Sequence, residues 1–290
     1  MSTKLTIPAT DVHTIMCTPS VSISQDDLNR IQELQAKKSS TEKWFAKDGT
    51  ELTKLQAKKE QAENGWQVSE GAKTLLFERY VKDKHDVRKI FSTTETARGN
   101  LVEGDIIRYA SRFFGCELVK NTESKPIEKY GIRGICDVNP KENELGIGVD
   151  MKSVADFDKV HKPITTEHIW QCKAYCMTYG VKEWYLYRLL VPTPDNILAK
   201  KAWQEASNMG YEFGSDEHAG IVDKYKRYND NIQLMPLEMR TNVFKVELLD
   251  GELEEWQRRY AKCAGYYKTV GAMLQQHKLY LDGIRNSVKS

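Results

Sequence analysis

The chain has 290 residues, of which 40% are hydrophobic and 29% are charged, a balance typical of folded proteins rather than disordered ones. This length is sufficient for one large domain or two small ones with a sizeable core. A net charge of +2 and an isoelectric point near 8.1 argue against a protein that coats nucleic acid, but acidic metal ligands can offset local basic patches.

Several common classes of protein are not indicated by the sequence. No run of about 18 apolar residues occurs, so no transmembrane helix is expected. The first residues lack the basic start and apolar stretch of a secretory signal, so export is not expected. The six histidines have no zinc-ligand spacing, and the Gly-x-x-x-x-Gly-Lys-Ser/Thr loop of ATP-driven motors is missing from the sequence.

The six cysteines are scattered along the chain without a Cys-x-x-Cys pair, and we expect reduced, mostly buried thiols. Cys172 and Cys176 are four residues apart and have the spacing of two metal ligands on one helix. An iron–sulfur cluster is usually held by four cysteines, whereas Cys263 stands alone late in the chain. Buried thiols are therefore the better interpretation of this pair.

The N-terminal part of the chain predicts a helical hairpin. Residues 26–62 are rich in lysine, glutamine, glutamate and alanine, and they repeat Leu-Gln-Ala-Lys-Lys at 34–38 and 55–59. Lys47-Asp48-Gly49 predicts the turn between the two helices. Two interpretations stay open: a solvated charged arm without a specific role, or a lysine-bearing arm near a phosphate backbone.

The remaining elements follow from hydrophobic periodicity. Two helices are expected at 69–82, capped by Ser69, and at 97–114, with an apolar face of Leu101, Ile106, Ile107 and Phe113. Short β-like runs between 130 and 152 indicate a β-hairpin. We then expect a helix at 167–179, a strand at 181–191, a polar loop with one helix at 193–220, a strand at 241–248 and a helix from 250 to about 286. This order predicts an α/β fold with a mixed central sheet flanked by helices.

The candidate chemistry lies at the predicted β-hairpin. Asp137 ends one strand, and Asp150-Met151-Lys152 lies on the next. Alternation along a strand places Asp150 and Lys152 on one face and turns Met151 into the core. Two neighbouring carboxylates repel each other unless a hard cation such as Mg²⁺ lies between them. Lys152 is then suited to hold the attacking water or the scissile phosphate.

Residues on the flanking helices extend this set. Glu103 adds a third carboxylate from the helix before the sheet, and Gln171 lies on the helix after it. Tyr175 is four residues from Gln171 and shares its face. Arg98 and Arg133 flank the acidic residues and, with Tyr175, are candidates for DNA contacts.

Together these residues resemble a known family. Asp137 followed by Asp150-x-Lys152 resembles the PD-(D/E)xK nuclease signature, with Asp as the second acid. With Gly99-x-x-x-Glu103 before it and Gln171-x-x-x-Tyr175 after it, the order is similar to YqaJ-type phage recombination exonucleases, the group that includes the lambda exonuclease. The resemblance spans roughly residues 65–270 and includes the segments 69–73, 90–92 and 227–229. It departs from the signature in having Cys136 rather than proline before Asp137.

The resemblance implies a fold and a set of residue roles. It implies a restriction-endonuclease-like core in a nuclease domain of residues 65–290, preceded by an N-terminal segment of residues 1–64. Mg²⁺, or Mn²⁺ in its place, would be bound by Glu103, Asp137, Asp150 and the backbone carbonyl of Met151. Lys152 would orient or activate the attacking water, and Gln171 would support the site.

It also implies an activity and partners. The expected activity is metal-dependent 5′→3′ degradation of linear duplex DNA from its ends, in phage-type recombination beside a single-strand annealing protein. A ring trimer, phage origin and the bacterial cytoplasm are the expected assembly and setting, without a membrane. Two alternatives stay open: a structure-specific endonuclease, and a catalytically silent adaptor of the same fold that binds DNA ends or a partner protein.

Overall fold

The computed structural model describes residues 4–17, 23–40, 43–63, 65–87, 94–121 and 126–289. The chain divides into two compact units, one of residues 1–5, 13–88 and 251–290 and the other of residues 6–12 and 89–250. The helix that follows the predicted division at residue 64 packs against the C-terminal helix, and both helices belong to the first unit. The resembling segment 90–92 lies outside the described residues.

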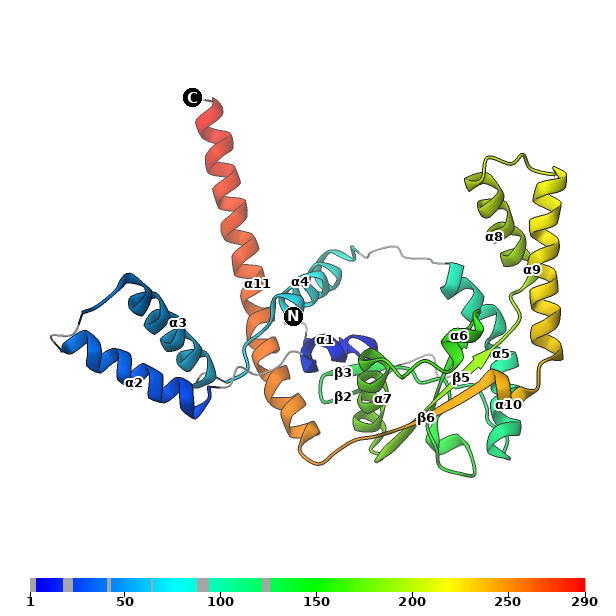
Figure 1. The fold of residues 1–290 in the computed structure, drawn as a ribbon, viewed down its shortest axis with the longest axis horizontal. Coiled ribbons are helices and arrows are strands. Elements are labelled where there is room, and N and C mark those ends of the chain that lie inside the picture. The colour runs from blue at the N-terminus through cyan, green and yellow to red at the C-terminus, as the bar shows by residue number, and fades with distance from the viewer. Residues whose placement is uncertain are drawn as a thin grey trace. The chain divides into compact units, whose positions relative to one another are not determined.

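The first unit contains the predicted helical hairpin, formed by α2 (Gln25–Ser39) and α3 (Ala46–Glu63) (Figure 1). Ile31, Leu34 and Leu52 form its own small core. The predicted turn at Lys47-Asp48-Gly49 is wrong, since these residues belong to the first turn of α3. The reason is that the carboxylate of Asp48 accepts a hydrogen bond from the Phe45 N–H across 3.1 Å and so stabilises the helix start.

The other helices of this unit are α4 (Glu70–His85), α11 (Glu252–Lys289) and the short α1 (Val12–Met16). Ser69 caps α4, as predicted, by accepting a hydrogen bond from the Ala72 N–H. α4 packs on α11, where Tyr80 and Tyr267 meet edge to face with ring centroids 5.5 Å apart. The predicted C-terminal helix is therefore confirmed.

The second unit contains two three-stranded mixed sheets. In the smaller sheet, β3 (Ile132–Gly134) lies between the parallel β1 (Ile7–Pro8) and the antiparallel β2 (Ile127–Lys129). In the larger, β5 (Glu183–Leu190) lies between the parallel β4 (Val149–Val154) and the antiparallel β6 (Thr241–Glu247). The predicted α/β class with a mixed sheet flanked by helices is confirmed, although the strands divide between two sheets.

The predicted β-hairpin between residues 130 and 152 takes another form. The hairpin that forms is β2–β3, which turns at Tyr130 and Gly131 with φ of 55° and 76°. The chain then passes a short 3-10 helix, η2 (Pro140–Glu142), before β4. The segment that carries Asp137 meets β4 only at the antiparallel bridge between Val138 and Val149.

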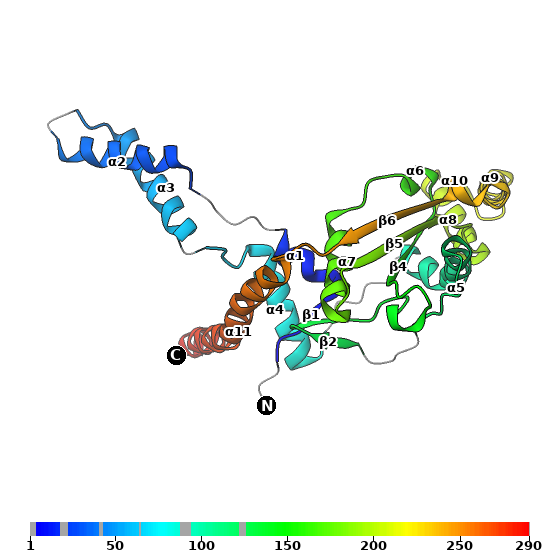
Figure 2. The same cartoon turned by 90° about the horizontal axis from the view of Figure 1, so that it is seen from below.

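Helices cover both faces of the larger sheet. α5 (Thr94–Phe114) packs on β4, and α7 (Thr166–Tyr179) packs on β5 and β6 (Figure 2). α5 buries Ile106 and Ile107 but leaves Leu101 and Phe113 57% and 53% exposed, so half of its predicted apolar face is wrong. Its buried face is instead completed by Val102 and Ala110.

The region predicted as a polar loop with one helix contains two. α8 (Asp195–Asn208) and α9 (Asp216–Leu234) pack against each other as a second helical hairpin (Figure 1). Ser215 caps α9 by accepting a hydrogen bond from the His218 N–H. Two single-turn helices, α6 (Phe157–Val160) and α10 (Leu237–Arg240), and the 3-10 helix η1 (Ala9–Asp11) complete the unit. Among the described residues, no helix is long and apolar enough to cross a membrane.

Candidate active site

Strand β4 presents the predicted Asp150-Met151-Lys152 triplet. In the parallel register with β5, Asp150 lies opposite Leu186 and Met151 opposite Tyr187. Met151 is buried in the core beneath α5, whereas Asp150 and Lys152 share the opposite face. The Lys152 ammonium lies 2.8 Å from Asp150 Oδ2, which confirms that the two side chains point together.

Asp137 reaches the same place without lying in a strand. It occupies a bend between β3 and the bridge residue Val138, so its predicted position at a strand end is wrong. The backbone N–H of Met151 donates a hydrogen bond to Asp137 Oδ2 across 2.7 Å. The Asp137 carbonyl accepts another from the Asn121 N–H across 2.8 Å. Hydrogen bonds thus fix both the side chain and the backbone of Asp137 beside β4.

Gln171 connects the site to helix α7. Its Nε2 donates to Asp150 Oδ1 across 3.2 Å and to the Tyr175 hydroxyl across 3.3 Å. The Tyr175 hydroxyl donates in turn to the carbonyl of Ile135 across 3.0 Å. This chain of hydrogen bonds links β4, α7 and the segment that leads to Asp137.

Gly134 permits the close approach of Tyr175 to that segment. A Cβ atom at Gly134 would lie 3.0 Å from the Tyr175 ring and 3.1 Å from the Ala9 side chain, tighter than ordinary contact. A larger residue would displace either the tyrosine or the backbone that it holds. Gly134 therefore contributes to the site by its lack of a side chain.

An open cleft of about 550 Å³ lies over these groups. Its walls come from α5, β4 and α7, with one residue from η1 and one from the bend before Val138. The residues that line it are Thr10, Glu95, Thr96, Gly99, Asn100, Glu103, Ile106, Asp137, Met151, Lys152, Ser153, Glu167, His168 and Gln171.

The electrostatics at the cleft are dominated by two carboxylates, the buried Asp150 and the half-buried Asp137. Burial and then the charge of Asp150 raise the pKa of Asp137 well above its usual range, and the Met151 N–H and Lys152 offset this only in part. Burial opposes the charged form of Lys152, but Asp150 and Asp137 outweigh it and raise the Lys152 pKa. Asp150 Oδ2 is inaccessible to solvent and, among the described residues, has no hydrogen-bond partner apart from its ion pair with Lys152.

Glu103 lines the same cleft but does not join the other acids closely. Its Oε2 lies 2.5 Å from the ammonium of Lys120. Within the described ranges, no group of three or more histidine, cysteine, aspartate or glutamate side chains is close enough to hold a metal ion. The structure thus brings Asp137, Asp150, Lys152 and Gln171 together and leaves Glu103 at the rim.

The three candidate DNA contacts have different outcomes. Arg98 is 3% exposed and donates to the carbonyls of Val154 and Val191, so the prediction that it contacts DNA is wrong. Tyr175 is 4% exposed and is held by the hydrogen bonds above, so it offers no face to a base. Arg133 is exposed, lies 3.8 Å from Glu128 and stays a candidate.

His168 was not predicted as a site residue. It lines the cleft, and its Nδ1 is buried without a hydrogen-bond partner among the described residues. Burial, followed by the charge of Lys152, lowers its pKa and favours a neutral imidazole. Its position three residues before Gln171, on the same helix face, is the sequence signal that identifies it.

The burial of most of the cysteines agrees with the sequence analysis. Cys172 and Cys176 are buried within α7, and burial raises the pKa of Cys172 far above that of a free thiol. Cys136 and Cys263 are also buried, Cys116 is half-buried and Cys17 is exposed. All six are free thiols.

Comparison with solved structures places this geometry in a known fold. A phage-related exonuclease from Haemophilus somnus 129PT superposes with a TM-score of 0.59 at 18% identity, over 94% of this chain and 97% of that one. The two chains share a fold. An alkaline exonuclease (LHK-Exo) from Laribacter hongkongensis gives a TM-score of 0.48 at 10% identity, over 96% of this chain and 94% of its own. No protein-family model and no curated protein matches the sequence.

Proposed function

We propose that the protein is a divalent-metal-dependent deoxyribonuclease that degrades linear duplex DNA from its ends. The observation that carries the proposal is that Asp137, which lines the open cleft, lies beside the buried Asp150 and its ion-pair partner Lys152. The fold shared with a phage-related exonuclease supports hydrolysis of DNA and action at an end.

The residues present fit a divalent cation. Two largely buried carboxylates lie beside the Lys152 ammonium, and within the described part of the chain Asp150 Oδ2 has no donor other than this ion pair. Hard cations such as Mg²⁺ prefer carboxylate and carbonyl oxygens of this kind. Asp137 and Asp150 would hold the ion, with Glu103 and the Met151 carbonyl as the remaining protein ligands. When bound, the ion supplies Lewis-acid polarisation of the scissile phosphate and neutralises its charge.

The other side chains of the cleft have separate roles in this proposal. Lys152 places its ammonium beside the attacked phosphate and orients the nucleophilic water. Gln171 fixes the rotamer of Asp150 through the hydrogen bond at Oδ1. Glu103 would leave its ion pair with Lys120 and turn its carboxylate towards the metal ion. Its side chain is partly exposed at the rim of the cleft, where such a change of partner is possible.

The finer features of the proposal are the direction of degradation and the assembly. We infer 5′→3′ polarity, a role in phage-type recombination beside a single-strand annealing protein, and a closed ring of subunits that retains the DNA. These follow from the resemblance to YqaJ-type exonucleases carried by Glu103, Asp137, Asp150 and Lys152.

Digestion of matched linear and circular duplexes tests the activity. We expect Mg²⁺ to support release of nucleotides from the linear DNA only, EDTA to abolish it, and duplexes labelled at the 5′ or 3′ end to report the direction. Asp150→Asn removes the reaction, whereas the surface control Asp158→Asn, which breaks an exposed pair with Lys162, leaves it intact. Full activity of Asp150→Asn contradicts the proposal, and cutting of circular DNA points to an endonuclease.

Titration calorimetry distinguishes an enzyme from a silent adaptor. Mn²⁺ should bind the wild-type protein in the millimolar range or tighter, and the heat should disappear in Asp137→Asn/Asp150→Asn. DNA binding without any metal binding would favour an adaptor of DNA ends.

A further inference from the structure

The N-terminal hairpin carries an exposed aromatic ring among lysines at its tip, which we define as Lys37, Lys43, Phe45 and Lys47. Phe45 is 44% exposed, although it directly follows Trp44, whose side chain packs against the hairpin core. A large apolar side chain at this position is not needed for the packing of α2 on α3. It is available to an external group.

The lysines surround this ring. The ammonium groups of Lys37, Lys43 and Lys47 lie 5.4, 5.4 and 5.7 Å from the centroid of Phe45. Lys43 and Lys47 have no ion pair with any described residue, whereas Lys37 lies 2.8 Å from Asp48. Among the described residues, the tip therefore places lysine ammonium groups around an exposed apolar ring.

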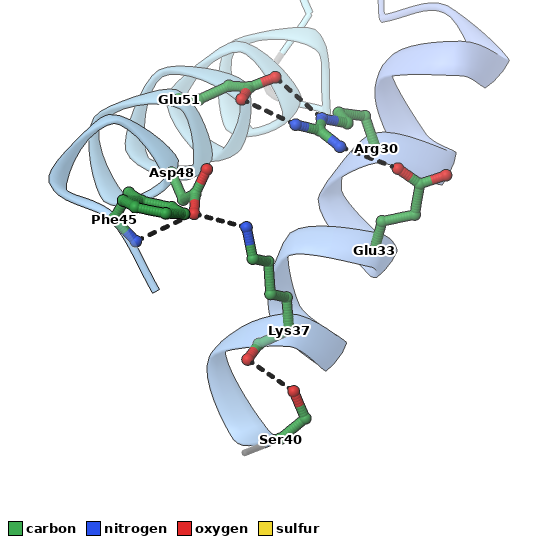
Figure 3. A network of polar contacts seen from close by, with 7 residues as sticks. All are labelled: Arg30, Glu33, Lys37, Ser40, Phe45, Asp48 and Glu51. Carbon is green, nitrogen blue, oxygen red and sulfur yellow. Dashed lines mark hydrogen bonds and ion pairs between the residues drawn. The ribbon is translucent and has the colours of Figure 1, made fainter. Parts of the chain in front are cut away.

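Ion pairs join α2 to α3, and Figure 3 shows those of Arg30 with Glu51 and of Lys37 with Asp48. Arg30 donates two hydrogen bonds to Glu51, at 2.9 and 3.1 Å, and Lys58 lies 2.6 Å from Asp27. These pairs neutralise acidic side chains along the body of the hairpin.

Asp48 connects helix α2 to the residue that precedes α3. Figure 3 shows its carboxylate between the Lys37 ammonium and the backbone N–H of Phe45. These two donors hold the pKa of Asp48 below its usual range, so the carboxylate stays ionised near neutral pH. Asp48 thus fixes the start of α3 and, with it, the position of the Phe45 ring.

We propose that the hairpin tip binds single-stranded DNA, with a base stacked on Phe45 and the neighbouring phosphates on Lys43 and Lys47. Aromatic rings interleaved with lysines bind single strands because every base has a face that can stack, while the backbone phosphates require cations. A duplex keeps its bases stacked on each other and would use only the lysines. An exposed ring therefore favours a single strand.

This inference rests on the proposed function in one respect. Degradation of one strand of a duplex from its end leaves the complementary strand single, and the tip would hold that product strand. Binding itself needs no cleavage and can be measured in EDTA. The hairpin and the nuclease can thus be tested separately.

Fluorescence anisotropy with a labelled single-stranded oligonucleotide, in EDTA and over a range of salt, tests the tip. Each phosphate contact on a single strand contributes about 0.7 to the slope of log K against log salt. Lys43→Gln/Lys47→Gln should therefore reduce the slope by about 1.4 and weaken binding. The control Lys54→Gln/Lys59→Gln removes the same charge from the same hairpin but away from the tip, and it should retain most of the affinity.

The ring is tested in parallel with the lysines. Phe45→Ala should weaken single-strand binding about tenfold, in line with the loss of one stacked base, and should leave duplex binding unchanged. Phe45→Tyr keeps a stacking face and should bind like the wild type. Circular dichroism and thermal unfolding confirm that each variant keeps its helices, and a variant that does not is replaced by Phe45→Leu.

Two outcomes overturn the inference. One is single-strand affinity of Phe45→Ala equal to that of the wild type, which is also the result expected if the tip docks a protein. The other is an equal loss in the lysine control. If linear duplex is still degraded in either case, the nuclease proposal stands while the hairpin inference fails. If no DNA is cut but the tip variants lose single-strand binding, the reverse holds.

Discussion

The backbone N–H of Met151 donates a hydrogen bond of 2.7 Å to the carboxylate of Asp137, fourteen residues earlier in the chain. This bond brings a carboxylate from an irregular segment to the residue that follows Asp150 on β4. Two acids that repel each other are thereby held side by side, and Lys152 forms an ion pair with Asp150. The repulsion between these two carboxylates destabilises the folded protein, as is common where a functional site needs clustered charge.

Asp137→Asn should stabilise the metal-free protein near neutral pH. The pKa of Asp137 is raised in the folded state, so the folded protein binds more protons than the unfolded chain, and stability in EDTA falls as pH rises from the usual carboxyl range towards neutrality. An asparagine keeps an acceptor for the Met151 N–H and removes the charge. Its melting temperature should rise by roughly 2–4 °C for each kcal/mol relieved, as calorimetry at pH 5 and pH 7.5 can measure. A rise at pH 7.5 no larger than that at pH 5 contradicts this account.

Lys152→Met should remove activity and destabilise the apoprotein. The change leaves the buried Asp150 without its ion pair, and loss of one partner of a buried pair costs up to about 3–5 kcal/mol. We expect cleavage to fall by about 10²–10³, the scale seen when one stabilising group for transition-state charge is removed. Single-turnover digestion and melting curves with and without Mg²⁺ provide the measurement. Mg²⁺ should recover part of the lost stability, since it replaces the missing cation.

Gln171→Leu tests whether the amide positions Asp150. The leucine fills a similar volume but cannot donate to Asp150 Oδ1 or to the Tyr175 hydroxyl. Loss of a hydrogen bond that orients a metal ligand typically weakens metal binding about 10- to 100-fold. Mn²⁺ calorimetry should show this loss, while Gln204→Leu, on the exposed surface of α8, should bind Mn²⁺ normally. Equal affinities of the two variants would show that Gln171 has only a structural role.

Glu103 and Lys120 form a pair whose exchange can be measured. If Glu103 joins the metal, Lys120 competes with the ion for the same carboxylate, because the two groups are 2.5 Å apart. Lys120→Met should then tighten Mn²⁺ binding by a few-fold, and Glu103→Gln should weaken it. The double variant should bind like Glu103→Gln alone. An unchanged affinity in Glu103→Gln removes this residue from the set of ligands.

Gly148→Ala should destabilise the fold without touching the cleft. A Cβ atom at this position would lie 2.3 Å from the ring of Trp184, which is completely buried. Overpacking of this kind costs about 1–3 kcal/mol, and denaturant unfolding is the measurement. Gly220→Ala, on α9 with nothing within 4 Å of its Cβ, should instead stabilise the protein by about 0.5–1 kcal/mol. Equal effects of the two changes would contradict the packing argument.

The amino-acid sequence by itself determined the features that depend on near neighbours in the chain. Ser69 predicts the start of α4, alternation places Asp150 and Lys152 on one face of β4, and a four-residue spacing joins Gln171 to Tyr175. Each of these depends on a local repeat of a helix or strand. They sufficed to predict the α/β class and most of the candidate site.

Only the tertiary structure decided which side chains are buried, hydrogen-bonded or ion-paired through contacts between distant segments. Arg98 was expected to contact DNA, but its guanidinium is buried and donates hydrogen bonds to carbonyl groups more than fifty residues away in the sequence. Asp137 was expected in a strand and lies in a bend, and Glu103 pairs with Lys120 from another segment. The turn expected at Lys47 became helix because the Asp48 side chain caps the Phe45 N–H. Local sequence patterns cannot predict such partners, because burial and ion pairing depend on contacts between segments that are far apart in the sequence.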